Sequence, residues 1–184
     1  TTFVHDTLLV YADISNQFSW ENKQGFKAEY FNNRDLSGTP ASTITESAID
    51  HFWQEGQTVV GNVIATNFSA RYTTNYTATA DGSITFEVDG DDGYKLSING
   101  KEVINTWLRN RMGARTYKLQ TKKDTVYKVV LEYFQGAGKA NITLRAGNFE
   151  RTNYNALANR VKDADVIVYV GGISPQLEGE EMPV

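Results

Sequence analysis

The chain has 184 residues, a net charge of −4 and no cysteine, with 40% hydrophobic and 22% charged residues. This is enough for one well-packed core in an ordinary soluble domain, and without cysteine neither disulfides nor thiolate metal sites are available. No cluster of Lys or Arg points to nucleic acid or an anionic membrane, and no apolar run approaches the roughly 20 residues that span a bilayer.

The first 25 residues are expected to form a strand followed by a linker. Residues 8–11 are an apolar run bounded by polar residues, which indicates a buried strand. The residues after it, up to about Gly25, are polar with isolated aromatic side chains. We therefore expect residues 1–25 to be separate from the domain that follows.

Residues 26–150 have the pattern of an antiparallel β-sandwich or barrel-like module. In residues 83–104, three runs alternate between apolar and polar side chains, and Gly-containing turns separate them, at Asp81–Gly82, Asp89–Gly93 and Asn99–Gly100. Side chains alternate between the faces of a strand, so each run buries one face. Since Asn-Gly and Asp-Gly favour tight hairpin turns, this stretch is predicted to be a β-meander. With further alternating runs on both sides, about eight to ten short strands indicate a sandwich or barrel.

Residues 151–184 have a different pattern. Apolar residues from Tyr154 to Ala164 recur at helical spacing, and Val166 to Val170 is continuously apolar. A continuous apolar strand after an amphipathic helix is typical of a sheet that is covered on both faces. This segment is therefore expected to belong to an α/β fold, which makes the whole chain mainly β with short α/β flanks.

From about Phe26 to Phe149 the chain resembles the protective-antigen fourteen-kilodalton module, a β-sandwich often attached to glycosidases, adhesins and toxins. The matching stretches are, in order, KAEYF, NFSARYT, ITFEVDGDDGYKLSINGKEVINTW and VVLEYFQGAGKANITL. The tail resembles the second, αβα domain of family-three glycoside hydrolases, through ADVIVYVGGISPQLEGEEM. In some of these enzymes the β module is inserted within that domain. The resemblance thus implies that residues 1–25 and 151–184 are the two ends of a split αβα domain.

The resemblance implies a fragment of a retaining β-glycosidase whose inserted module binds oligosaccharide or shapes substrate access. The parent would hydrolyse β-glucosides or β-xylosides, and its remaining domains would be partners of this chain. Since the domain with the nucleophile is missing, the chain by itself is expected to be inactive. The alternatives are a stand-alone carbohydrate-binding module and a ligand-free structural or interaction spacer. The compartment stays open, with an extracellular or periplasmic location favoured.

The acidic loop near the C-terminal end carries the candidate catalytic residues. Family-three enzymes place a Glu general acid/base on a loop of the second domain, so the resemblance implies Glu178 as the first candidate and Glu180 as the second. A retaining enzyme needs two carboxyl groups about 5–5.5 Å apart, and the second would come from the missing domain. The alternative is an acidic loop that is simply solvated.

Asp91 and Asp92 are the candidate metal ligands. In adhesin members of the module family, an adjacent Asp pair in this loop binds calcium, which then binds sugar hydroxyls. Calcium takes about six to eight oxygen ligands, so another loop would have to contribute, and Asn105 and Asn110 are the obvious candidates. A turn held by Asx hydrogen bonds is the favoured alternative. We therefore expect no cofactor, with calcium as the exception to test.

Aromatic and basic residues form the candidate sugar-binding surface, because aromatic faces pack on the apolar C–H faces of pyranose rings. The candidates are Trp53, Trp107, Arg109 and Arg111. For the two tryptophans the alternative is a place in the core. The two histidines, His5 and His51, have no matching Cys or His nearby and are expected to be surface or capping residues.

Overall fold

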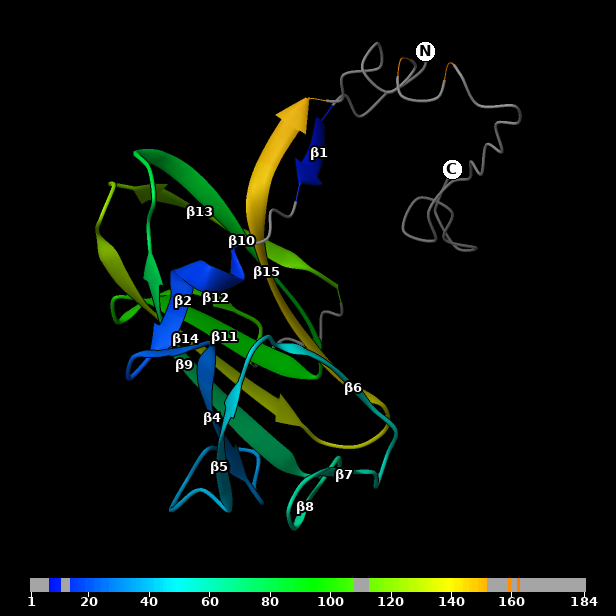
Figure 1. Cartoon of the computed structure of the whole chain (residues 1–184). Helices are drawn as coiled ribbons and strands as arrows, with labels where there is room; N and C mark the ends of the chain where they lie inside the picture. The colour runs from blue at the N-terminus through cyan, green and yellow to red at the C-terminus, as the bar shows by residue number, and fades with distance from the viewer. Residues whose placement is uncertain (1–6, 11–13, 108–112, 152–158, 160–161, 163–184) are drawn as a thin grey trace. The chain divides into compact units, whose positions relative to one another are not determined.

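The computed structural model describes residues 7–10, 14–107, 113–151, 159 and 162 (Figure 1). The chain divides into two compact units, Thr7–Glu150 and the combination of Thr1–Asp6 with Arg151–Val184. The expected helix over residues 154–164 lies outside the described residues apart from Asn159 and Lys162, and the expected strand over residues 166–170 lies wholly outside them. The described strands belong to the first unit, apart from the last residue of β15.

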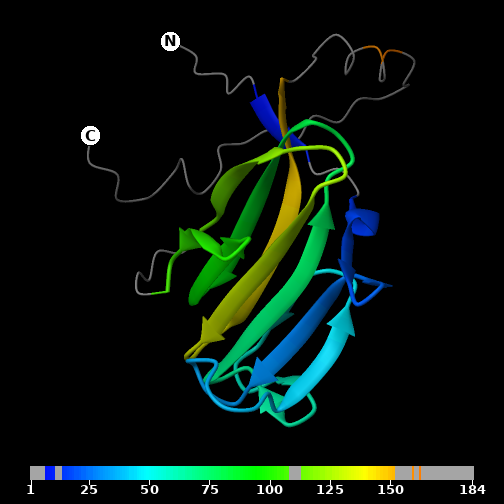
Figure 2. The ribbon, with the colours of Figure 1, turned by 90° about the vertical axis from the view of Figure 1, so that its left-hand side faces the viewer.

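Two β-sheets make up this unit (Figure 2). The five-stranded sheet has the order β1-β15-β10-β13, with β6 also paired to β15. Its strands are β1 (Thr7–Val10), β6 (Asp50–Trp53), β10 (Gly82–Asp91), β13 (Arg115–Thr121) and β15 (Ala140–Arg151).

The eight-stranded sheet has the order β12-β11-β14-β9-β2-β3, with β4 paired to both β9 and β5. Its strands are β2 (Phe18–Trp20), β3 (Lys23–Gln24), β4 (Phe26–Phe31), β5 (Ser42–Glu46), β9 (Phe68–Thr77), β11 (Gly93–Ile98), β12 (Lys101–Asn105) and β14 (Val126–Gln135). A small hairpin, β7 (Thr58–Val60) with β8 (Val63–Ile64), and a 3-10 turn, η1 (Ser15–Gln17), complete the described elements. The registers between described strands are antiparallel, and the predicted mainly-β sandwich is confirmed.

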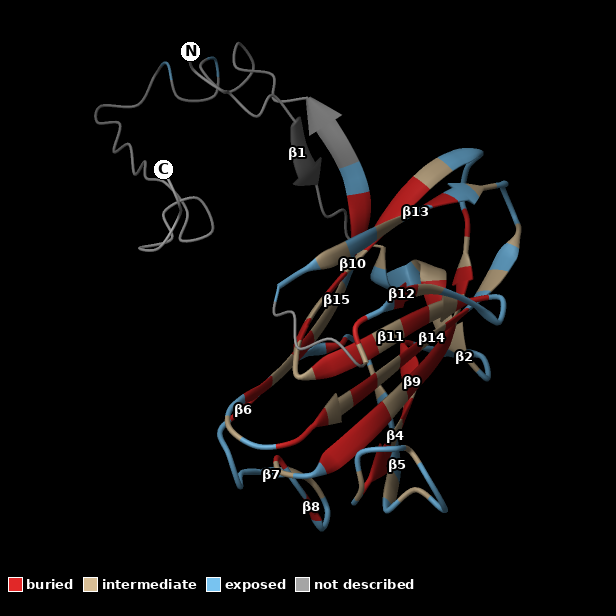
Figure 3. Ribbon diagram, turned by 180° about the vertical axis from the view of Figure 1, so that it is seen from behind, coloured by how far each residue is buried: buried red, intermediate tan, exposed pale blue. Residues whose placement is uncertain are grey.

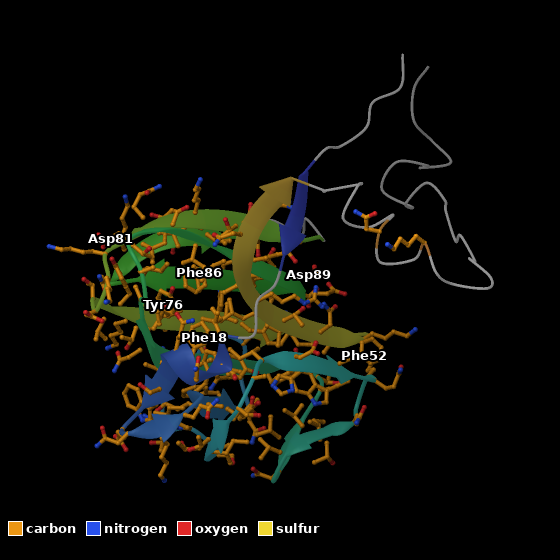
Figure 4. All side chains as sticks on the ribbon, turned by 45° about the horizontal axis from the view of Figure 1, so that its top comes forward. Phe18, Phe52, Tyr76, Asp81, Phe86 and Asp89 are labelled. Carbon is orange, nitrogen blue, oxygen red and sulfur yellow. The ribbon has the colours of Figure 1, made fainter. Side chains whose placement is uncertain are left out.

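The core between the sheets is rich in aromatic side chains, and Figure 3 shows buried residues recurring along β9, β11 and β14. Tyr76 of β9 meets Phe86 of β10 edge to face, with ring centroids 5.7 Å apart. Phe18 of β2 packs against both of them (Figure 4). Because alternate residues of each strand face inward, the two sheets bury one continuous apolar layer.

The sandwich begins earlier in the sequence than expected. Strand β1 pairs with β15 and β2 pairs with β9, so both lie in the sheets of the unit that starts at Thr7. The ring of Phe18 is buried and lies 5.3 Å from the ring of Phe26. The stretch expected to be a linker is therefore a short strand and hairpin with one buried aromatic residue. At the other end, the first unit ends at Glu150.

The predicted β-meander is wrong. Strands β10 and β11 lie in different sheets, as do β9 and β10, so the chain crosses the sandwich at Asp92 instead of making a hairpin there. Of the three turns predicted in residues 81–100, only the one at Asn99–Gly100 joins paired neighbours, β11 and β12, and both of its residues have positive φ, 51° and 78°. Alternation determines which face of a strand is buried, but it does not identify the strand's partner.

Candidate functional site

The Asp91–Asp92 pair lies at the crossing from one sheet to the other. Strand β10 ends at Asp91 and β11 begins at Gly93, and the peptide bond between the two aspartates is cis. Both carboxylate-bearing residues are half-buried, whereas Gly93 is buried opposite Phe134. A Cβ at Gly93 would lie 2.3 Å from a ring carbon of Phe134, so only glycine allows this close approach.

The loop after β14 holds the carboxylate of Asp92. The amide of Gly136 donates a hydrogen bond of 2.7 Å to Oδ2 of Asp92, and its carbonyl oxygen accepts one of 2.8 Å from the amide of Asn67. A Cβ at Gly136 would lie 3.1 Å from that Oδ2 and 3.4 Å from Nη1 of Arg34, in the loop after β4. Three loops therefore meet at the aspartate pair.

Buried hydrogen bonds support this loop from beneath. Gln135 is fully buried, and its Nε2 donates to the carbonyl oxygens of Ala137 and Lys139 at 2.7 and 3.1 Å. The hydroxyl of Tyr133 lies 2.9 Å from Oε1 of Gln135 and also donates to the carbonyl oxygen of Asp91. Because these side chains are buried and satisfied, they fix the carbonyl group of Asp91 and the backbone of the loop after β14.

The two carboxylates affect each other electrostatically. Partial burial raises the pKa of Asp91, and the neighbouring charge of Asp92 raises it further. Burial also raises the pKa of the Tyr133 hydroxyl, and the charges of Asp92 and Asp91 add to that effect. Holding both carboxylates charged therefore costs free energy, and a hydrogen-bond donor or a cation close to the pair would lower that cost.

The calcium expectation depends on oxygens beyond the aspartate pair, and the candidate Asn110 lies outside the described residues. The described residues contain no group of three or more His, Cys, Asp or Glu that could hold a metal ion, and Oδ2 of Asp92 already accepts from Gly136. The side chain of Asn105 is also engaged, with Glu102 Oε1 at 2.8 Å and the amide of Trp107 at 2.8 Å. Since calcium takes about six to eight oxygens, a calcium site here would need ligands beyond these residues.

Trp107 packs on Phe134, which lies opposite Gly93, the residue after the aspartate pair. The two ring centroids are 4.8 Å apart at an angle of 57°, and Nζ of Lys95 lies 4.7 Å from the centroid of the Trp107 ring. The Tyr94 hydroxyl donates to the carbonyl oxygen of Gly113 at 3.0 Å, which fixes the far end of this loop. Burial raises the pKa of Tyr94 to about 12. The other two candidates of this loop, at positions 109 and 111, lie outside the described residues.

Trp53 is part of the core and lies opposite Ala140 in the register of β6 with β15. Its side chain is 7% exposed, its ring stacks on that of His51 at 4.7 Å, and it meets Phe68 edge to face at 5.6 Å. A ring packed in this way favours the core alternative, and the exposed aromatic residue beside it is Phe52 (Figure 4). Glu178 and Glu180 lie outside the described residues.

His51 links the two sheets, which the sequence did not indicate. Its Nε2 lies 2.7 Å from Oε2 of Glu46, and the other oxygen of Glu46 accepts a hydrogen bond from the hydroxyl of Tyr30. His51 belongs to β6 of one sheet, whereas Glu46 and Tyr30 belong to β5 and β4 of the other. No spacing in the sequence marks such a contact, because it depends on how the sheets face each other.

The PA14 domain family matches residues 22–153, and the chain belongs to this family. The chain is 27% identical over 167 residues to a xylan 1,4-beta-xylosidase of Xylanibacter ruminicola, covering 89% of this chain and 19% of that protein. It is also 27% identical over 120 residues to the anti-sigma-I factor RsgI3 of Acetivibrio thermocellus, covering 65% of this chain and 18% of that protein. The chain therefore spans about a fifth of the length of these curated relatives.

Solved structures share the fold. An anti-sigma factor domain-containing protein from Clostridium clariflavum matches with a TM-score of 0.62 and 25% identity, covering 69% of this chain and 44% of that one. A beta-glucosidase from Kluyveromyces marxianus in complex with glucose matches with a TM-score of 0.57 and 17% identity, covering 83% of this chain and 20% of that one. Among the described residues, no helix is long and apolar enough to cross a membrane.

Proposed function

We propose that the chain is a saccharide-recognition module of a larger retaining β-glycosidase, in which it binds oligosaccharide or shapes substrate access. The similarity to the xylan 1,4-beta-xylosidase supports this, because it covers 89% of the chain and so extends beyond the residues matched by the family. The module would act together with the parent's remaining domains, which include the one that carries the nucleophile. The chain would thus contribute selectivity rather than the bond-breaking step.

The observation that carries the proposal is the fixed orientation of Asp92. Its Oδ2 is held by the amide of Gly136, so the carboxylate keeps one oxygen to accept hydrogen bonds from sugar hydroxyls. The loop beneath it is ordered by the buried Gln135. A site that is already ordered loses little conformational entropy when a ligand binds, which favours recognition of a flexible oligosaccharide.

The aromatic and basic groups beside the turn fit the same role. Trp107 is half-buried, and Lys95 lies over its ring. A sugar placed against the turn would meet a carboxylate acceptor, an ammonium donor and the apolar edge of an indole. Ligand sites typically combine a few oriented polar groups with aromatic side chains in this way.

The catalytic acid/base of the parent is proposed from the resemblance alone. Glu178, or else Glu180, would protonate the glycosidic oxygen of the departing sugar, which contributes about 10²–10⁴-fold when the acid is held against bound substrate. The β module would lie at the rim of that site and limit which oligosaccharides enter.

Calorimetric titration of the 184-residue chain with xylohexaose and with cellohexaose tests the proposal. We expect one of the two to bind, and Asp92→Asn to weaken binding because the amide offers one acceptor oxygen in place of two. Asp50→Asn, on the exposed part of β6, is the matched control and should bind like the unsubstituted chain. Equal affinity in Asp92→Asn would refute a role for this turn.

If neither sugar binds, the spacer or interaction-module alternative gains support, which the similarity to an anti-sigma-I factor also favours. Asp92→Asn in the parent enzyme then distinguishes a module that shapes substrate access from a spacer. A changed kcat/KM on long but not short oligosaccharides would indicate that the module shapes access. Unchanged values on both would indicate a spacer.

A further inference from the structure

We propose a second saccharide-binding site, in the hollow between the β2–β3 hairpin and strands β4 and β5. There the ring of Trp20 would stack on a neutral pyranose, and nearby hydroxyl and ammonium groups would bind its hydroxyls. This site is separate from the Asp91–Asp92 turn and does not rest on the function proposed for that turn.

The local backbone projects Trp20 from a hairpin tip. The turn residues Glu21 and Asn22 both have positive φ, 46° and 62°, as in a two-residue type I′ turn. Trp20 is directly opposite Lys23 in the register, so their side chains lie on the same face of the hairpin. Phe18, two residues earlier, supplies the buried contact of this strand, and Trp20 does not belong to the core cluster.

The hollow beside Trp20 has a volume of about 270 Å³. Its lining includes polar or charged side chains from the hairpin and from two neighbouring strands, namely Lys23, Lys27, Thr43 and Thr45. The register places Lys27 opposite Thr45 and Glu29 opposite Thr43, so both threonines share the solvent face with these charged residues. Hydroxyl and ammonium groups therefore surround the indole, an arrangement that matches the alternating donors and acceptors of a sugar.

Trp20 differs from the other two tryptophans in how much of its ring is already in use. Trp53 is buried and stacked, and Trp107 packs against Phe134 beneath Lys95. Among the described residues Trp20 has only one ring partner, Nζ of Lys27, which lies 5.7 Å from the ring centroid. That distance is close to the outer limit of about 6 Å for a cation–π contact, so the ring retains area for a ligand.

The charges around the hollow favour a neutral sugar. Nζ of Lys27 is paired with Oε1 of Glu29 at 2.7 Å. Glu21 and Lys23 both line the hollow, so one charge of each sign comes from the hairpin. With positive and negative side chains matched, no net field selects an anionic sugar, and hydrogen bonding together with ring stacking determines the ligand.

The indole N–H signals of the ¹⁵N-labelled full chain provide the test, since each of the three tryptophans gives one. During titration with xylohexaose or cellohexaose, we expect the Trp20 signal to shift and to saturate, and to do so equally in Asp92→Asn. Trp20→Ala should abolish this binding without lowering the melting temperature, because Trp20 lies outside the core. Thr45→Val keeps the side-chain shape but removes the hydroxyl, so affinity should fall roughly threefold to tenfold, the range for one lost hydrogen bond. Thr116→Val, on the exposed part of β13, is the matched control.

An unmoved Trp20 signal with both neutral sugars would overturn the proposal, as would a response to oligogalacturonate alone. An affinity for the sugar that is unchanged in Thr45→Val would also overturn the proposal, since the hydroxyl would then have no part in binding. If the signals of Trp107 and Gly136 respond while that of Trp20 does not, this second site is refuted and the function proposed for the turn stands. If the Trp20 signal responds while those of Trp107 and Gly136 do not, the second site is supported and the function proposed for the turn is refuted.

Discussion

Oδ2 of Asp92 accepts a hydrogen bond of 2.7 Å from the backbone amide of Gly136. This contact joins the crossing between β10 and β11 to the loop after β14, which are 44 residues apart in the chain. It gives the carboxylate a defined direction before any ligand arrives. Little space surrounds this contact, because a Cβ at Gly136 would lie close to both Asp92 and Arg34.

Gly136→Ala should weaken saccharide binding more than it weakens folding. The new Cβ would lie 3.1 Å from Oδ2 of Asp92 and 3.4 Å from Nη1 of Arg34, so the carboxylate or the guanidinium has to move. Calorimetric titration and thermal unfolding of the same sample would separate the two effects. Ala137→Ser, at the exposed neighbouring position, is the control and should behave like the unsubstituted chain. Unchanged affinity in Gly136→Ala would contradict a role for the orientation of Asp92.

Asp91→Asn should stabilise the fold at neutral pH. Partial burial and then the charge of Asp92 raise the pKa of Asp91 above its usual 3.8. The folded protein therefore binds this proton more tightly than the unfolded chain does, so stability is lost as the pH rises from below 3.8 through the raised value. The melting temperature of Asp91→Asn should exceed that of the unsubstituted chain at pH 7, and the difference should vanish below pH ~3.5. A difference that is the same at every pH would show that charge is not the cause.

Leu96→Ala should cost about 2–5 kcal/mol of unfolding free energy, because the substitution leaves a cavity in a tightly packed interior. Leu96 is fully buried and opposite Leu131 in the register of β11 with β14. Ser97→Ala, on the other face of the same strand, should change stability by less than about 0.5 kcal/mol. Chemical denaturation measures both, and equal losses would mean that the inward face of β11 has been assigned incorrectly.

Calcium should have little effect on the chain. The described residues offer the carboxylates of Asp91 and Asp92, and one carboxylate oxygen is already hydrogen-bonded. We expect the melting temperature to be the same in calcium and in a chelator, since a ligand that binds only the folded state would raise it. A calcium-dependent rise that Asp92→Asn removes would show that a metal site forms here.

The sequence predicted the buried faces well because alternation is a local property of each strand. The alternation in residues 83–104 predicts one buried face for each run, and Phe86 and Leu96 of that stretch are fully buried. The turn at Asn99–Gly100 was also predictable, since its residues tolerate the positive φ that a two-residue hairpin requires.

The pairing of the strands was less predictable. An Asp-Gly-rich stretch such as Asp89–Gly93 suits a hairpin turn and a crossing between sheets equally well, and the choice depends on strands distant in sequence. For the same reason Trp20, Lys27 and Thr45, which are brought together by two different hairpins, could not be recognised as neighbours. At the turn proposed as a site, the aspartate pair and Trp107 were candidates from the sequence. The support from Gly136 and Gln135 was not, because glycine and glutamine after a strand carry no distinctive pattern.

Titration of the ¹⁵N-labelled chain with xylohexaose and with cellohexaose, followed at the backbone amide of Gly136, tests the central claim most directly. This amide donates to Oδ2 of the carboxylate whose other oxygen is proposed to receive the sugar, so its signal reports on that carboxylate. We predict a saturable shift with one of the two sugars, and no sugar-dependent shift in Asp92→Asn. A Gly136 signal that stays fixed with both sugars, or that moves to the same extent in Asp92→Asn, would contradict the assignment of this turn as a saccharide site.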